Sequence, residues 1–250
     1  MKPRRIFVLA ATLALFSAAA GAQAIRVLAS NGMREVINDL KPAAEKTLGK
    51  PLQLEFGSTT MLKPKLESGE GYDVAIVTAE AMDDLVKSGK IAHTSVVRLA
   101  RCGIGVGIRA GAPKPDIKTG EALKQALLHV KAISYAQDGA SRTAVEKMFT
   151  RMGIAEQMKA KTVLEQGSVR AAGKVVSGDA DFVLTLVSEI LPIKGVELLG
   201  PLPSEYQGYV SFSAGVAAKA ANPGPAASFV KSLVVPANAA AYKAKGMEPL

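Results

Sequence analysis

The chain has 250 residues, of which 48% are hydrophobic, 5% aromatic and 21% charged, and its formal net charge is +9. This aliphatic content excludes an intrinsically disordered protein, and the length fits one large domain or two smaller ones. One cysteine excludes an internal disulfide, and with only His93 and His129 the sequence offers little for metal binding. We therefore predict no cofactor and no bound metal.

The N-terminus has the pattern of a secretory signal peptide. Three basic residues among the first five precede an apolar run over residues 6–20, and a stretch of small residues ends at Ala24. The run is shorter than the roughly 20 residues that span a bilayer, and alanines at 22 and 24 fit a cleavage site. We predict a signal peptide over residues 1–24, cleaved near Ala24, and a periplasmic mature protein, with a membrane anchor as the alternative.

The positive charge is smaller in the predicted mature chain. Removal of residues 1–24 takes away three basic residues and no acidic one, so the formal charge falls from +9 to +6. The remaining lysines and arginines form no run of five and do not alternate with aromatic residues. We therefore predict no nucleic-acid partner.

The mature chain begins with a strand-and-helix pattern that occurs three times. The predicted strands cover 25–29, 52–56 and 73–77, and apolar residues at helical spacing follow each of them, up to residues 48, 66 and 86. Short strands that alternate with helices predict a parallel, doubly wound α/β sheet.

Beyond residue 96 the pattern indicates a second lobe. Two glycine-rich strands, 96–100 and 103–108, lead into a second α/β series, and a strand at 209–216 precedes two terminal helices. We predict that lobe 1 comprises 25–104 and 210–250 and that lobe 2 comprises 105–209. In this prediction each lobe is a mostly parallel sheet flanked by helices, and two crossover strands join the lobes. The ligand of such a protein binds in the cleft between the lobes.

The loops at the carboxyl ends of the predicted strands are rich in hydroxyl groups. Serine or threonine occurs there at Ser30, at Ser58 to Thr60, at Ser141 and at Ser168. Hydroxyls and the free amides of helix N-termini suit a small anion. For a single loop, an ordinary helix N-cap explains the same residues. Four such loops that meet at one cleft favour a binding site.

Four segments in these loops resemble the periplasmic molybdate-binding proteins of ABC importers, which are type II periplasmic binding proteins. The segments are Leu28-Ala29-Ser30, Phe56 to Leu62, Gly139-Ala140-Ser141 and Ser168-Val169-Arg170, and the resemblance covers essentially the whole mature chain. It implies a two-lobed fold and an ABC permease as a partner. It also implies an anion site of two hydroxyls from one lobe, two backbone amides from the other and a tyrosine.

Carried over to this chain, the hydroxyls fall on Ser30 and Thr59 and the amides on Ala140 and Val169. Thr185 stands where the tyrosine is expected, and because threonine is shorter, we expect a larger pocket. Arg142 offers a fork for a carboxylate, unless it is a surface residue or pairs with Glu146. The predicted ligand-binding residues are therefore Ser30, Ser58, Thr59, Ala140, Ser141, Arg142, Val169 and Thr185.

Two functions follow from this pattern. The favoured one is a monomeric periplasmic binding protein for a small anion, with an organic carboxylate preferred over an oxyanion. The alternative is an isomerase, because the resembled group includes the periplasmic aconitate isomerase, which shifts a proton along an unsaturated tricarboxylate. Asp138, Glu165, Tyr135 and Tyr72 are titratable candidates near the cleft, but no spacing identifies a base, so the catalytic residues stay unassigned.

Overall fold

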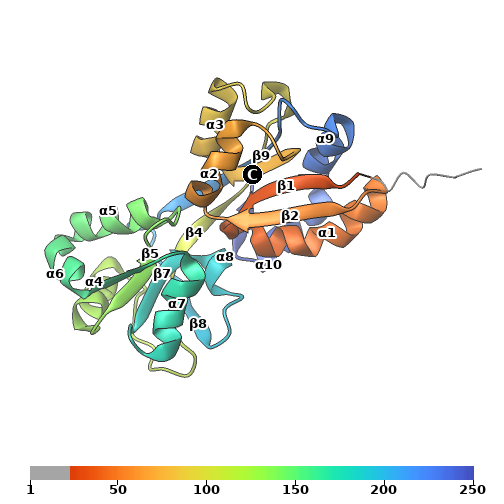
Figure 1. Ribbon diagram of the computed structural model, residues 1–250. Helices are drawn as coiled ribbons and strands as arrows, with labels where there is room; N and C mark the ends of the chain where they lie inside the picture. The colour runs from red at the N-terminus through yellow and green to blue at the C-terminus, as the bar shows by residue number, and fades with distance from the viewer. Residues whose placement is uncertain (1–22) are drawn as a thin grey trace, which may run out of the picture.

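The computed structural model describes residues 23–250, so that all but the last two residues of the predicted signal peptide lie outside the described residues. Figure 1 shows two lobes of strands and helices with β4 (Val97–Arg109) running from one to the other. Neighbouring strands of the sheet follow the order β2-β1-β3-β9-β4-β7-β5-β6, and β8 and β10 also pair with β4. None of the helices within residues 23–250 has both the length and the apolar character of a membrane span.

Lobe 1 begins with the three predicted strand-and-helix units. The strands are β1 (Ile25–Ser30), β2 (Leu52–Gly57) and β3 (Val74–Thr78), and the helices after them are α1 (Arg34–Leu48), α2 (Thr59–Ser68) and α3 (Ala79–Lys87). β1 pairs in parallel with β2 and β3, as predicted. β9 (Tyr209–Val216) pairs antiparallel with β3, which makes the sheet mixed. The lobe also contains α9 (Pro223–Ser232), α10 (Ala239–Ala244) and β10 (Met247–Pro249).

Lobe 2 contains a shorter parallel sheet. Its elements in chain order are α4 (Gly120–His129), β5 (Ile133–Ala136), α5 (Arg142–Met152), α6 (Ala155–Lys161), β6 (Thr162–Glu165), α7 (Ser168–Ser177), β7 (Phe182–Leu186), α8 (Val187–Ile190) and β8 (Val196–Pro201). β5 pairs in parallel with β6 and β7, whereas β7 and β8 are antiparallel to β4. α6, β6, β8 and β10 have no counterpart among the predicted elements.

β4 corrects one prediction. The sequence predicts two strands, 96–100 and 103–108, with glycines in the second, but β4 is a single strand of 13 residues. Its first half pairs with β9 and its second half with β7 and β8. A Cβ atom on Gly105 would lie 2.9 Å from Leu198, and one on Gly107 would lie 2.7 Å from Val183. These glycines therefore make room for neighbouring side chains and do not break the strand.

Gly32 lies at the junction of the two lobes, in the 3₁₀ turn Asn31–Met33. Its carbonyl oxygen accepts a hydrogen bond of 2.9 Å from Ser188 Oγ in α8. A Cβ atom at this position would lie 2.7 Å from Phe212 and 2.9 Å from Leu186. Both neighbours are buried, so there is little room for them to move.

We expect Gly32→Ala to lower the free energy of unfolding by about 1–3 kcal/mol, because it overpacks this junction. Urea denaturation of the mature protein measures the change. Gly173→Ala is the matched control, because Gly173 is exposed in α7 and no atom lies within 4 Å of its added Cβ. That control should be neutral or stabilising by up to about 1 kcal/mol. Equal stability of the Gly32→Ala variant and the wild type would contradict the overpacking.

Candidate functional site

The loops after the parallel strands of both lobes enclose a small cavity of about 20 Å³. It is lined by Ser30, Asn31, Ser58 and Thr59 from lobe 1 and by Asp138, Gly139, Ala140, Gly167, Ser168, Leu186 and Glu189 from lobe 2. The carboxyl ends of β1 and β2 thus face the carboxyl ends of β5, β6 and β7. This is the edge at which open α/β sheets bind ligands.

Helix capping accounts for only part of the hydroxyl groups at this edge. Ser58 caps α2, because its Oγ accepts a hydrogen bond of 3.1 Å from the Met61 amide. Ser30 and Ser141 also occupy N-cap positions, but neither side chain makes a capping hydrogen bond, and α7 is preceded by Gly167. Capping therefore explains Ser58 and leaves the side chains of Ser30 and Ser141 without that role.

Thr59 contributes a buried donor with no partner. Its Oγ1 is shielded from solvent and forms no hydrogen bond with any described residue. A buried polar atom without a partner is unfavourable and rare in folded proteins. Because Thr59 lines the cavity, an acceptor atom of a ligand there would satisfy this hydroxyl.

Asp138 joins the two lobes across the cavity. Ser58 Oγ of lobe 1 donates a hydrogen bond of 2.8 Å to Asp138 Oδ2. The Gly167 amide at the start of α7 donates one of 2.9 Å to Asp138 Oδ1. A carboxylate of the chain itself therefore accepts hydrogen bonds from two of the groups that line the cavity.

Glu189 is a second carboxyl group at the cavity, and it is not among the residues predicted from the sequence. It lies in the first turn of α8, where Thr185 Oγ1 donates a hydrogen bond of 2.5 Å to its Oε2. Burial raises the pKa of the Glu189 carboxyl above its ordinary value, and the negative charge of Asp138 raises it further. Hydrogen bonds from Thr185 and Ser168 and the positive charge of Arg34 oppose this shift. The sequence signal that could have identified Glu189 is its position four residues after Thr185, just beyond the end of β7.

We expect Glu189→Gln to remove a pH dependence of stability. Because the folded-state pKa is raised, Glu189 contributes stability that is full below the ordinary glutamate pKa and is lost as the pH rises through the folded pKa. The melting temperature of the variant minus that of the wild type should therefore increase from about pH 4 to about pH 8. Glu80→Gln is the control, because Glu80 is an exposed glutamate in the first turn of α3. A difference that does not change with pH would contradict the raised pKa.

A larger pocket of about 630 Å³ opens next to the cavity and shares Asn31, Gly167, Ser168 and Glu189 with it. Three cations line this outer pocket, namely Arg34 from lobe 1 and Arg170 and Lys194 from lobe 2. Arg34 lies 4.5 Å from the centre of the Phe56 ring, and its Nη2 donates a hydrogen bond of 2.7 Å to Asn31 Oδ1. These contacts hold its guanidinium beside the pocket.

The structure brings most of the predicted binding residues together. Ser30, Ser58, Thr59 and Ala140 line the cavity, and Val169, an exposed residue, lines the outer pocket. The remaining three lie outside both linings and are described by their own contacts. Thr185 is buried against Glu189, and Ser141 is buried at the start of α5.

Arg142 has two partners within lobe 2. Its Nε donates a hydrogen bond of 2.8 Å to Glu146 Oε1, and its Nη1 donates one of 2.9 Å to the Gln137 carbonyl oxygen. It lines neither the cavity nor the outer pocket. The Glu146 pair is one of the three roles that the sequence left open for this arginine, and it leaves less of the guanidinium free for a ligand.

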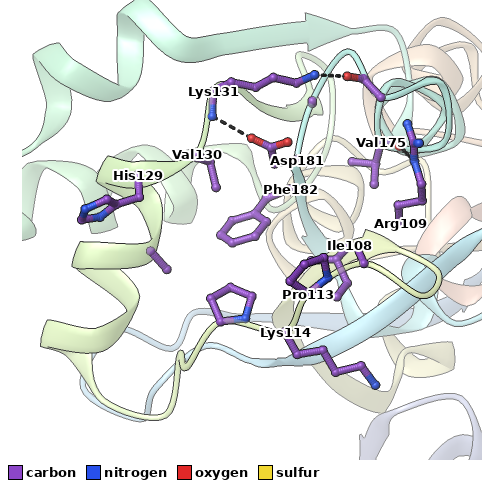
Figure 2. A pocket seen from close by; sticks show the side chains of 15 residues that line it. Ile108, Arg109, Pro113, Lys114, His129, Val130, Lys131, Val175, Asp181 and Phe182 are labelled. Atoms are coloured by element: carbon purple, nitrogen blue, oxygen red, sulfur yellow. Dashed lines mark hydrogen bonds between the residues drawn. The ribbon is translucent and has the colours of Figure 1, made fainter.

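A further hollow of about 640 Å³ lies in lobe 2, away from the predicted residues (Figure 2). Its basic side chains already have partners in the chain: Arg109 Nε donates to the Val175 carbonyl oxygen at 3.2 Å, Lys131 Nζ donates to Gly178, and Lys114 pairs with Glu197. Lys131 also donates its amide to Asp181 at 2.7 Å. This hollow thus lacks a buried donor in need of a partner. Across residues 23–250, no cluster of three or more His, Cys, Asp or Glu residues could hold a metal ion.

Comparison with known proteins assigns the family. The sequence profile of bacterial extracellular solute-binding proteins matches residues 25–248. The chain belongs to this family. An aconitate isomerase from a Pseudomonas species is 29% identical to this solute-binding protein over 232 residues, which covers 90% of this chain and 88% of that protein.

Solved structures with the same fold include two oxyanion-binding proteins. The periplasmic molybdate-binding protein of Azotobacter vinelandii aligns with a TM-score of 0.74 at 18% identity, over 89% of this chain and 98% of that one. The tungstate-binding protein TupA of Desulfovibrio alaskensis aligns with a TM-score of 0.65 at 16% identity, over 92% and 99%. The predicted type II periplasmic binding-protein fold and the resemblance to molybdate-binding proteins are thereby confirmed.

Proposed function

We propose that this solute-binding protein captures a small organic carboxylate between its lobes, in the periplasm. The observation that carries the proposal is Thr59 Oγ1, a buried hydroxyl without a partner at the edge where the two lobes meet. The Ser30 hydroxyl and the amides of Ala140 and Val169 supply the other donors. All of these groups donate hydrogen bonds, which suits the acceptor oxygens of an anion.

The surroundings of these donors favour a carboxylate over a molybdate-like oxyanion. The cavity also contains the carboxyl groups of Asp138 and Glu189. They already accept hydrogen bonds from Ser58, Gly167 and Thr185, which leaves fewer donors for a compact dianion. The outer pocket adds space and the cations Arg34, Arg170 and Lys194. Its volume of about 630 Å³ lies within the range of small-molecule sites, about 300–1,000 Å³. A ligand with two or three carboxylates would reach from the cavity to these cations.

Ligand entry requires the lobes to separate, because a cavity of about 20 Å³ holds little more than a water molecule. We propose that residues 25–104 with 210–250 move relative to residues 105–209. Binding would then stabilise one angle between the lobes, which is the form that an ABC permease of the inner membrane would recognise. In this proposal the protein acts as a monomer, and Ser141, Arg142 and Thr185 support the loops that hold the ligand.

Thermal melting of the mature protein with a panel of anions tests the proposal. A ligand that binds only the folded state raises the melting temperature, by an amount that grows with its concentration. We expect citrate, tricarballylate or succinate to raise it more than molybdate, tungstate or sulfate do. A rise with molybdate or tungstate and none with any carboxylate would refute the proposed ligand class.

A second candidate function is the isomerisation of an unsaturated tricarboxylate. It is favoured by the Pseudomonas aconitate isomerase, which matches 90% of this chain, and by the two carboxyl groups at the cavity. Incubation with cis-aconitate, followed by NMR, measures the ratio of the cis and trans isomers. An isomerase changes this ratio, whereas a protein that only binds the ligand leaves it as it was.

A further inference from the structure

Asp138 and Glu189 bring two carboxyl groups to one cavity from different parts of lobe 2. Asp138 follows β5, and Glu189 lies in α8 after β7. Both residues line the cavity, together with Thr59. The negative charge of Asp138 also raises the pKa of Glu189, so the two groups interact electrostatically.

The two carboxyl groups have different surroundings. Asp138 accepts hydrogen bonds from the Ser58 hydroxyl and the Gly167 amide, an arrangement that suits an ionised carboxylate. Glu189 is half-buried at the start of α8, where the Thr185 hydroxyl donates to it. Burial raises the pKa of its carboxyl, which favours the neutral, protonated form. A carboxylate and a carboxylic acid at one site are the groups that acid–base catalysis needs.

We propose that Asp138 and Glu189 form an acid–base pair that moves a proton between two carbon atoms of a bound unsaturated carboxylate. The proposal rests on carboxylate binding in the cleft and specifies residues for the second candidate function. Its substrates are di- or tricarboxylates in which a CH₂ group adjoins a carbon–carbon double bond.

The step balances without any other reactant. The Asp138 carboxylate takes a proton from the CH₂ carbon, and the electron pair of that C–H bond forms the new double bond. The electron pair of the old double bond takes the proton of the Glu189 carboxyl at the far carbon. Asp138 ends protonated and Glu189 ionised, and the same step in reverse, or proton exchange with solvent, restores the pair. Nothing is oxidised or reduced.

The cavity also stabilises the charge that develops in this step. As the proton leaves, negative charge spreads over the substrate carbons and onto its carboxylate groups. The unpartnered Thr59 hydroxyl and the Arg34 guanidinium lie where they can interact with such a carboxylate. Donors fixed in place before the reaction are an effective source of transition-state stabilisation.

The test follows deuterium incorporation from D₂O into cis-aconitate by NMR and, separately, the melting-temperature rise caused by tricarballylate. Tricarballylate is saturated, so it reports binding without proton transfer along a double bond. The variants are Asp138→Asn and Glu189→Gln, and Glu80→Gln is the control, because Glu80 is also in the first turn of a helix after a strand but is exposed on α3.

We expect the wild type and Glu80→Gln to incorporate deuterium. In Asp138→Asn and Glu189→Gln the rate of deuterium incorporation should fall on the order of 10²- to 10⁴-fold. Tricarballylate should still raise the melting temperature of both variants. A wild type that responds to tricarballylate but incorporates no deuterium overturns the pair and leaves carboxylate binding in place. A loss below tenfold in either variant also overturns it. If no carboxylate raises the melting temperature, both proposals fail.

Folding of the variants is checked by the same melting curves. If an amide variant shows no cooperative melting, Asp138→Glu or Glu189→Asp replaces it, since each keeps a carboxyl group but moves its oxygens. A variant with a displaced carboxyl group should also incorporate deuterium more than tenfold more slowly than the wild type. The reason is that proton transfer requires the carboxyl group to lie within hydrogen-bond distance of the carbon. A smaller loss would again overturn the pair.

Discussion

The Thr59→Val variant should bind carboxylates about 10- to 100-fold more weakly than the wild type. Valine keeps the shape of threonine but removes the hydroxyl, and a hydrogen bond to a charged group contributes about 1.5–3 kcal/mol. The free protein should become more stable at the same time, because the buried donor without a partner is removed. Isothermal titration calorimetry with tricarballylate measures the affinity, and urea denaturation measures the stability.

Thr60→Val is the matched control for this variant. Thr60 is the next residue of α2, is exposed, and lines neither the cavity nor the outer pocket. Its replacement should leave the affinity unchanged. If Thr59→Val and Thr60→Val both bind as the wild type does, Thr59 makes no contact with the ligand and the placement of the site is wrong.

Arg34→Gln should weaken the binding of tricarboxylates about tenfold and that of a monocarboxylate such as acetate much less. The reason is that Arg34 lines only the outer pocket, which a ligand reaches with its second or third carboxylate. The loss should shrink at high salt, because a partly exposed charge is screened.

Arg98→Gln separates this local effect from the change in net charge. Arg98 is exposed on β4 and lines neither the cavity nor the outer pocket. The Arg98→Gln substitution removes one positive charge, as Arg34→Gln does, and should leave the affinity for every carboxylate nearly unchanged. Equal losses in the two variants, or an equal loss for acetate and for tricarballylate in Arg34→Gln, would show that the outer pocket does not bind a second carboxylate.

The sequence predicts the elements that carry a strong local signal. β9 has the predicted bounds, and the helices after β1, β2 and β3 differ from their predictions by a few residues, because apolar spacing and the loops mark them clearly. The elements that were not predicted are short or partly exposed. β6 has four residues and β10 has three, and β8 is partly buried along most of its length. Pairing with β4 stabilises β8 and β10, and pairing with β5 stabilises β6. A sequence pattern does not display such pairing.

The hydroxyl residues of the candidate site could be predicted from the sequence, whereas the role of the Glu189 carboxyl group could not. Ser30, Ser58 and Thr59 follow strands that a pattern can find, so their place at a common edge follows from the topology. Glu189 belongs to a helix of only four residues, and its importance depends on what surrounds it. The bond from Ser58 to Asp138 connects residues 80 positions apart in different lobes. Local sequence patterns contain no information on such a contact.

A crystal structure of the mature protein with tricarballylate tests the central claim most directly. We predict electron density for the ligand between the lobes, with one carboxylate oxygen within hydrogen-bond distance of Thr59 Oγ1 and a second carboxylate near Arg34. Density for the ligand in the hollow of Figure 2 instead, with nothing bound between the lobes, would contradict the claim.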